Sequence, residues 1–110
     1  MTSVPLSIEV RYLRDEATLI LSGELDISTV PTLRSCIDSI DDHCRVVTLD
    51  LAGLTFLDST GIGFLIRLHQ AFIPEFRELL LSNAPDRVRH VLEIAGASEL
   101  FKVPYSRRRT

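Results

Sequence analysis

The stretch 46–70 constrains the fold more strongly than any other part of the chain. Residues 46–51 alternate between apolar and mostly polar side chains, which predicts a strand with one covered face. A short apolar link and the polar cluster Asp-Ser-Thr-Gly at 58–61 come next. From Ile62 onward, apolar residues recur three and four positions apart, which predicts a mostly buried helix. A strand therefore delivers a small polar cluster to the start of a buried helix.

The polar cluster has a simple structural explanation. The first-turn N–H groups of a helix lack partners within the helix, and the helix dipole places partial positive charge there. Asp58 or Ser59 can therefore cap the helix, and an added anion is tolerated or favoured at this position. On the local pattern alone, capping is the preferred interpretation and a signalling role is the second.

Strands and helices alternate along the rest of the chain. Apolar patterns predict strands over 6–13, 17–21, 46–51 and 76–82, with a last short strand at 100–103, and helices that start near residues 28, 61 and 85. The first two strands form an antiparallel hairpin followed by a loop at 22–28, and the later alternation specifies right-handed parallel crossovers. We therefore expect an α/β fold: a single-domain mixed, mostly parallel four- to five-stranded sheet with helices packed mainly on one face.

Composition and charge argue against several classes of protein. The chain has 110 residues and a formal net charge of −3, which argues against a nucleic-acid-binding face. No apolar run is long enough to span a membrane and no basic-then-apolar leader is present, so a cytoplasmic location is expected. Cys36 and Cys44 are too few for a disulfide scaffold or a zinc site. We interpret Cys36 as a buried, inert thiol and leave a redox bridge to Cys44 open, as the less favoured alternative.

The sequence lacks a recognisable catalytic pattern. Ser59 is not in the Gly-x-Ser-x-Gly setting of a hydrolase nucleophile, and no histidine stands in an obvious triad relation to it. The three histidines are scattered along the chain: His43, His69 and His90. Gly61 and Gly63 are followed by neither the lysine nor the third glycine of a phosphate-binding loop. Asp50 and Asp58 have no third ligand at metal-binding spacing. We therefore expect no enzyme activity, no cofactor and no metal site.

Two motifs, in this order and at this separation, resemble those of the STAS domain family. The string LDLAGLTFLDSTGIGFL (49–65) has an apolar strand, a short link, Asp-Ser-Thr-Gly and a helix that begins Ile-Gly. Gly-Glu-Leu-Asp stands at 23–26, before the first predicted helix. The resemblance is strongest to the bacterial anti-sigma factor antagonists and extends from about Val4 to Val103. It implies a STAS domain over 1–105, followed by a basic tail over 106–110 that we expect to be disordered.

The resemblance implies a phosphoprotein that regulates transcription through protein–protein interaction. In these antagonists, the unphosphorylated domain binds an anti-sigma factor serine kinase with a histidine-kinase-like ATPase fold, and this releases a sigma factor. The kinase then phosphorylates the serine that follows the motif aspartate, which ends the binding, and a PP2C-type serine phosphatase resets it. Carried onto this chain, Ser59 is the expected acceptor and Thr60 is the second choice. The expected motif and partner-binding residues are Asp58, Gly61, Ile62, Gly63, Glu24, Leu25 and Asp26.

Phosphorylation at a helix start has a predictable physical effect. A phosphate on Ser59 adds about −1.5 to −2 charge near neutral pH, and the helix dipole offsets part of its cost. We therefore expect the domain to stay folded and the switch to act at the docking surface.

Two other functions remain open at this point. One is a constitutive STAS scaffold or transporter-accessory subunit, in which the same helix docks without modification; the other, a nucleotide-binding enzyme, has no support in the sequence. The chain also departs from the family in two ways. Many members end with a further amphipathic helix, for which this sequence shows no pattern, and many have a glycine-rich link where this chain has residues 73–77, which contain no glycine. A missing helix would leave apolar surface uncovered, so we also leave a homodimer open.

Overall fold

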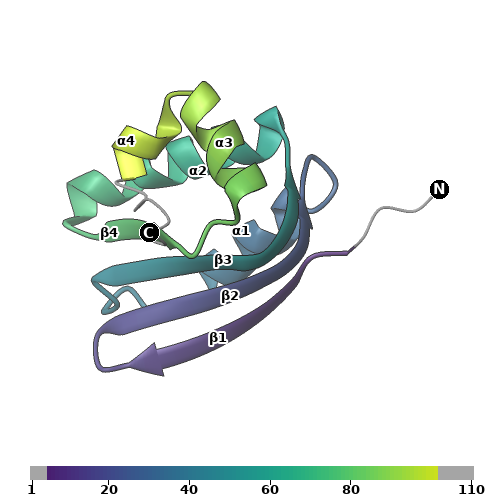
Figure 1. Ribbon diagram of the computed structural model, residues 1–110. Coiled ribbons are helices and arrows are strands. Elements are labelled where there is room, and N and C mark those ends of the chain that lie inside the picture. The colour runs from purple at the N-terminus through teal and green to yellow at the C-terminus, as the bar shows by residue number, and fades with distance from the viewer. Residues whose placement is uncertain (1–4, 102–110) are drawn as a thin grey trace, which may run out of the picture.

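A four-stranded mixed sheet forms the centre of the molecule (Figure 1). The computed structural model describes residues 5–101. Its strands lie side by side in chain order: β1 (Ser7–Leu13), β2 (Glu16–Leu25), β3 (Val46–Leu57) and β4 (Glu78–Ser82). β1 is antiparallel to β2, whereas β2, β3 and β4 run parallel to one another. The prediction of a mixed, mostly parallel sheet is confirmed.

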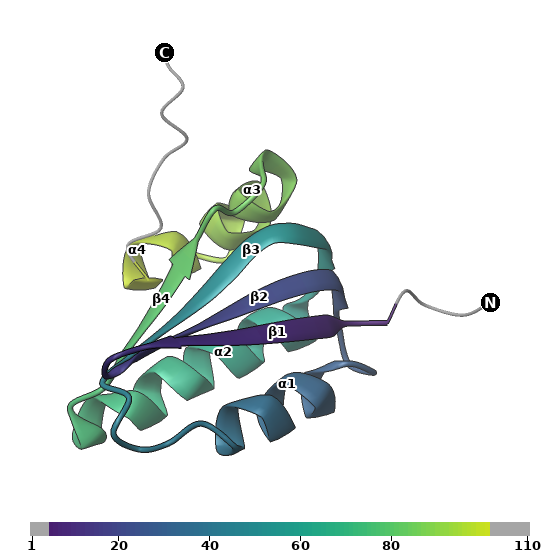
Figure 2. The same cartoon turned by 90° about the horizontal axis from the view of Figure 1, so that it is seen from below.

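Helices cover one face of the sheet and its β4 side (Figure 2). α1 (Val30–Asp38) and α2 (Ser59–Phe72) lie against the face, and α2 continues into the short 3₁₀ helix η1 (Ile73–Glu75). α3 (Asp86–Ile94) and α4 (Ala97–Phe101) lie on the β4 side. None of the helices in residues 5–101 is long and apolar enough to cross a membrane. The helices thus pack mainly on one face, as the alternation in the strands predicts.

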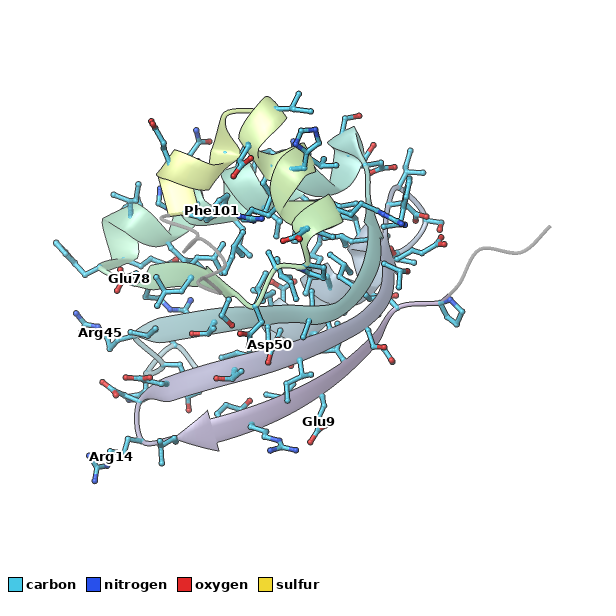
Figure 3. The ribbon with its side chains drawn as sticks, in the orientation of Figure 1. Glu9, Arg14, Arg45, Asp50, Glu78 and Phe101 are labelled. Carbon is cyan, nitrogen blue, oxygen red and sulfur yellow. The ribbon has the colours of Figure 1, made fainter. Side chains whose placement is uncertain are left out.

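The hydrophobic core fills the space between the sheet and the two helices on its face. Alternate residues of the three parallel strands point into this space. The buried apolar ones are Ala17, Leu19, Leu21 and Leu25 of β2, Val47, Leu49, Leu51, Leu54 and Leu57 of β3, and Leu79 and Leu81 of β4. The opposite face carries polar side chains such as Glu9 and Asp50, labelled in Figure 3, beside the half-buried Ile20. One covered and one open face is what a period of two requires.

β2 and β3 are longer than the sequence predicts. β3 pairs with β4 only over Val46–Asp50 and then continues along β2 to Leu57. Two register shifts, at Ile20/Ser22 and at Gly23/Glu24, insert extra residues of β3 against β2. The insertions break the alternation of β3, so the predicted link at 54–57 was wrong. The predicted loop at 22–28 was wrong over 22–25, where β2 continues to alternate as far as Leu25. The extra length carries both strands to the end of the sheet where the two motifs lie.

The end of the described chain also differs from the prediction. Residues predicted as a strand from Leu100 belong to helix α4, and 102–103 lie outside the described residues, as does the predicted tail at 106–110. Ala97 and Phe101 are four positions apart, so they share one helical face, and both are buried. The Phe101 ring meets His69 of α2 edge-on, with 5.4 Å between ring centroids. α4 therefore covers apolar surface that we expected to be open, and the homodimer stays a prediction.

Removal of the Phe101 ring tests whether α4 is part of the core. Phe101 is 2% exposed, so we expect Phe101→Ala to lower the free energy of unfolding by about 3–5 kcal/mol. Its neighbour Leu100 is 39% exposed, and Leu100→Ala should cost less than about 1 kcal/mol. Urea unfolding of the two variants measures the difference. Equal and small effects would mean that α4 is not packed on α2 in solution.

Candidate functional site

The two motifs meet at one end of the sheet. β2 and β3 run in the same direction and end together, with Leu25 paired to Leu57. The residues that follow, Asp26 and Asp58, are therefore neighbours, and the backbone N–H of Asp58 donates to the carbonyl oxygen of Leu25 at 3.3 Å. α2 begins at the next residue, Ser59. Two motifs that are far apart in the sequence thus form one compact site.

Asp58 is the residue that caps α2. Its backbone is extended, its Oδ1 accepts a hydrogen bond from the Gly61 N–H at 2.8 Å, and its carbonyl oxygen accepts from the Ile62 N–H at 3.0 Å. This arrangement satisfies one of the free N–H groups of the first turn. The sequence left open whether Asp58 or Ser59 caps the helix, and the structure assigns the cap to Asp58.

Ser59 is therefore not needed for capping. It is the first residue of α2 and it is exposed, and its hydroxyl has no hydrogen-bond partner among residues 5–101. Thr60, one position further into the helix, is half-buried. Of the two adjacent hydroxyls, that of Ser59 is more accessible to an incoming protein.

The loop after β2 is held by hydrogen bonds around Asp26. Its Oδ1 accepts from the Ser28 hydroxyl at 2.7 Å, from the Ser28 N–H at 2.9 Å and from the Thr29 N–H at 3.1 Å. These bonds, that of the Ser28 hydroxyl above all, lower the pKa of the Asp26 carboxyl from its ordinary value. Thr29 is buried, and its Oγ1 donates to the Glu24 carbonyl oxygen at 2.8 Å and accepts from the Asp26 N–H at 2.9 Å. The loop therefore has a fixed shape without any partner.

Gly61 allows the first turn of α2 to pack directly on the strand ends. A Cβ atom at this position would lie 2.8 Å from Cδ1 of Leu57 and 2.9 Å from the carbonyl oxygen of Leu25. Both contacts are shorter than real Cβ atoms make, and one involves backbone, which cannot move aside easily. Gly63 is different, because outside the helix's own backbone an added Cβ would approach only Nη1 of Arg67 among the described residues, at 3.3 Å. Gly61 is thus required by the fold, whereas Gly63 is not.

The predicted partner-binding residues divide into two groups. Leu25 and Ile62 are 0% and 7% exposed, and Gly61 is buried as well, so these residues position the site from within and offer a partner almost no side-chain surface. The other predicted partner-binding residues are at least partly accessible: Glu24, Asp26, Asp58 and Gly63. The two candidate acceptors, Ser59 and Thr60, are accessible to the same degree or more. The first group was expected to contact a partner, and its burial argues against direct side-chain contact.

Sequence reasoning missed two exposed apolar side chains at this end of the sheet. Ile27, in the loop after β2, is 72% exposed, and Phe56, near the end of β3, is 45% exposed. Phe56 is paired in register with Glu24, so the two side chains are neighbours across the strands. The sequence alone gives no signal for Phe56, because its exposure follows two insertions that become visible only when β3 is paired with β2. Leu25 and Leu57 point into the core, so their strand neighbours Glu24 and Phe56 point to the opposite face of the sheet. We use the name Ser59 surface for the accessible residues that gather at this end of the sheet: Glu24, Asp26, Ile27, Phe56, Asp58 and Ser59.

The other candidate groups are not assembled into sites. In the part of the chain that the structure describes, no three His, Cys, Asp or Glu side chains are close enough to hold a metal ion. Asp50 instead accepts a hydrogen bond from the Ala52 N–H at 3.0 Å. Cys44 is buried and Cys36 half-buried, both are free thiols, and burial raises the pKa of the Cys36 thiol. A raised thiol pKa lowers the thiolate fraction and hence the reactivity.

Comparison with known proteins identifies the family. The STAS domain model matches residues 7–109. The anti-sigma-B factor antagonist of Staphylococcus aureus (strain NCTC 8325 / PS 47) is 31% identical over 84 residues, which are 76% of this chain and 78% of that protein. The chain belongs to the STAS domain family.

Solved structures share the fold. An anti-sigma factor antagonist from Mycobacterium paratuberculosis superposes with a TM-score of 0.80 at 22% identity, over 96% of this chain and 92% of the other. The antagonist SpoIIAA in its unphosphorylated form superposes with a TM-score of 0.71 at 20% identity, over 91% of this chain and 90% of the other. A sulfate transporter family protein from Wolinella succinogenes superposes with a TM-score of 0.71 at 23% identity, over 86% of this chain and 80% of the other. At these identities the likeness shows the fold alone.

The two glycines of α2 give a matched pair of substitutions. We expect Gly61→Ala to lower the free energy of unfolding by about 2–3 kcal/mol, because the added methyl overlaps the Leu25 backbone. Gly63→Ala should raise it by about 0.5–1 kcal/mol, because alanine favours the helix and Arg67 is flexible enough to move. Denaturant unfolding measures both. If both variants were equally stable, the close contact between α2 and β2 would be absent in solution.

The Asp26 loop gives a prediction about pH. Because the carboxyl has a lowered pKa in the folded protein, its bonds contribute stability above the pKa of the unfolded chain. That contribution is lost as the pH falls through the lower, folded pKa. Carboxyl NMR titration should find the pKa of the Asp26 carboxyl below its ordinary value. The Ser28→Ala substitution should raise this pKa, because it removes the hydroxyl hydrogen bond. An unchanged titration in Ser28→Ala would contradict the hydrogen-bond network.

Proposed function

We propose that this protein is an anti-sigma factor antagonist whose binding is switched off by phosphorylation of Ser59. The unphosphorylated form binds an anti-sigma factor kinase at the Ser59 surface and thereby releases a sigma factor. The observation that carries the proposal is the exposed hydroxyl of Ser59, which stands at the start of α2 while Asp58 performs the capping. A hydroxyl with no structural task is free to be modified.

The local geometry favours a domain that stays folded after modification. Ser59 lies at the positive end of the α2 dipole, where added negative charge is stabilised. Its side chain is outside the core, and the cap and the packing of Gly61 do not involve it. A phosphate therefore has no internal contact to break, and its effect is exerted on whatever protein docks there.

The composition of the Ser59 surface explains why a phosphate would end binding. Ile27 and Phe56 offer apolar area to a partner, and three carboxylates already give this end of the sheet negative charge. A docked partner would bury the dianion beside these carboxylates and remove its water. A penalty of about 3 kcal/mol weakens binding roughly a hundredfold, which is enough for a switch.

The relatives supply the identity of the partners in this proposal. The curated relative is named an anti-sigma-B factor antagonist, and SpoIIAA has been solved in a form described as unphosphorylated. By analogy, the partner is an anti-sigma factor serine kinase, a PP2C-type phosphatase resets Ser59, and the protein works in the cytoplasm. Thr60, half-buried, remains the second choice of acceptor.

A constitutive scaffold or transporter-accessory subunit is the second candidate. The sulfate transporter family structure favours it, because the same fold occurs there at a similar TM-score. In that case α2 would dock without modification. Incubation with ATP and each kinase-like anti-sigma factor of the source cell separates the two functions: intact-mass spectrometry that finds no phosphate on Ser59 or Thr60 supports the scaffold.

Charge substitutions at Ser59 test the switch directly. We expect Ser59→Glu to bind the kinase-like partner about a hundredfold more weakly than Ser59→Ala, because the carboxylate meets the same desolvation and repulsion as a phosphate. Titration calorimetry measures both affinities, and circular dichroism checks that both variants are folded. Thr60→Glu serves as the control for charge at a less accessible neighbouring position. Equal affinities of Ser59→Glu and Ser59→Ala would refute the switch.

A further inference from the structure

Gly63 and Arg67 form a feature that neither the core nor the docking surface explains. Gly63 lies inside α2, where glycine lowers helix stability relative to alanine. The core of the described chain does not require a glycine there, because outside the helix's own backbone an added Cβ would approach only Nη1 of Arg67 among residues 5–101, at 3.3 Å. The Arg67 guanidinium therefore lies against the bare backbone at Gly63, one helical turn before its own Cα.

This position directs the guanidinium toward Ser59. Ser59, Gly63 and Arg67 are spaced four residues apart, so they lie along one face of α2. Cβ positions four residues apart on a helix are separated by about 5–6 Å. The guanidinium thus lies about one turn from the Ser59 side chain, and a phosphoryl group on Ser59 adds three acceptor oxygens that reach into this gap.

Arg67 is also available for a new partner. It is exposed and forms no ion pair with any carboxylate of residues 5–101. Arg34 of α1, by contrast, has its guanidinium over the Phe64 ring, 5.0 Å from the centroid. Other charged groups at this end of the sheet include the carboxylates of Glu24, Asp26 and Asp58, and Arg87 of α3 lines a pocket with Leu54 and Thr55 of β3. A planar guanidinium matches the oxygens of a phosphate better than any other side chain does.

We propose that Arg67 is the internal counter-ion of phosphorylated Ser59. A small rotation of the Arg67 side chain, for which Gly63 leaves room, brings the guanidinium to the phosphate oxygens. The phosphate is then held along α2 in a fixed position, and Arg67 is no longer free to bind a partner. The inference depends on the proposed function only for the choice of Ser59 as acceptor.

The test uses phosphoserine incorporated at position 59 during translation, so that neither kinase nor anti-sigma factor is needed. Phosphorus-31 NMR follows the second pKa of the phosphate as a function of pH. We expect Arg67→Gln to raise this pKa by about half a unit relative to the otherwise unchanged protein. Arg67→Lys should raise it by less, because the charge is retained.

Matched controls separate a specific pair from a general effect of charge. Arg11→Gln removes the same charge from β1, where Arg11 is paired with Glu9 at 2.8 Å, and should leave the phosphate pKa unchanged. The three nearby carboxylates are present in every variant, so the difference isolates Arg67. An unchanged pKa in Arg67→Gln, or an equal shift in Arg34→Gln, would overturn the proposal.

Thermal unfolding provides a second readout. Without phosphate, Arg67→Gln should unfold at the same temperature as the unaltered chain, because Arg67 is exposed and unpaired in the described structure. With phosphoserine at 59, the same substitution should lower the midpoint by about 3 °C. If Arg67→Gln destabilised the unphosphorylated and the phosphoserine-59 proteins equally, Arg67 would have a merely structural role and the counter-ion proposal would be refuted. The proposed switch is tested independently of the Arg67 proposal: it is refuted if the phosphoserine-59 protein binds the kinase as tightly as the unmodified protein does.

Discussion

The arrangement of the site depends on the close contact between the first turn of α2 and the ends of β2 and β3. Because Gly61 has no side chain, the helix start comes within van der Waals distance of the Leu25 carbonyl and the Leu57 side chain. The Asp58 N–H adds a hydrogen bond across the same junction. The two sequence motifs are therefore mechanically one unit, and neither loop can shift without the other.

Within this unit, the polar groups that shape the backbone are satisfied internally. Asp26 and Thr29 bond to each other and to the loop between them, and Asp58 bonds to the helix start. The accessible side chains at this end of the sheet then include the unbonded Ser59 hydroxyl, the three carboxylates and two apolar side chains, Ile27 and Phe56. A surface with a preformed backbone and few unsatisfied polar groups suits protein recognition, because little ordering is needed on binding.

The sequence predicted the parts of the fold that follow a simple period. Alternation located the buried face of β3, and helical spacing located α2, since both patterns are local consequences of backbone geometry. It failed where two registers had to be matched between distant strands, because the insertions opposite Gly23 are visible only once β2 and β3 are paired. It also failed at α4, which packs against α2 and β4 as well as against the preceding α3, so part of the burial of Ala97 and Phe101 comes from elements distant in sequence.

The same distinction applies to the site. The position of Ser59 at a helix start could be predicted, because Asp-Ser-Thr-Gly before an apolar helix has few other structural interpretations. The sequence could not predict whether Asp58 or Ser59 caps the helix, because both side chains carry an oxygen that can accept a hydrogen bond from the first turn. The exposure of Phe56 depends on the strand insertions, and the burial of Leu25 depends on a strand that continues beyond its predicted end.

The separate roles of Asp58 and Ser59 have a consequence for how this protein can change over evolutionary time. Because folding depends on the aspartate and not on the serine, a lineage can lose the hydroxyl and keep a fully abundant protein. Under the proposed switch, such a loss would leave the protein permanently able to bind its partner, so its effect on the cell would be excess gene expression and not a missing component. Regulation and foldability can therefore be inherited independently at two adjacent codons.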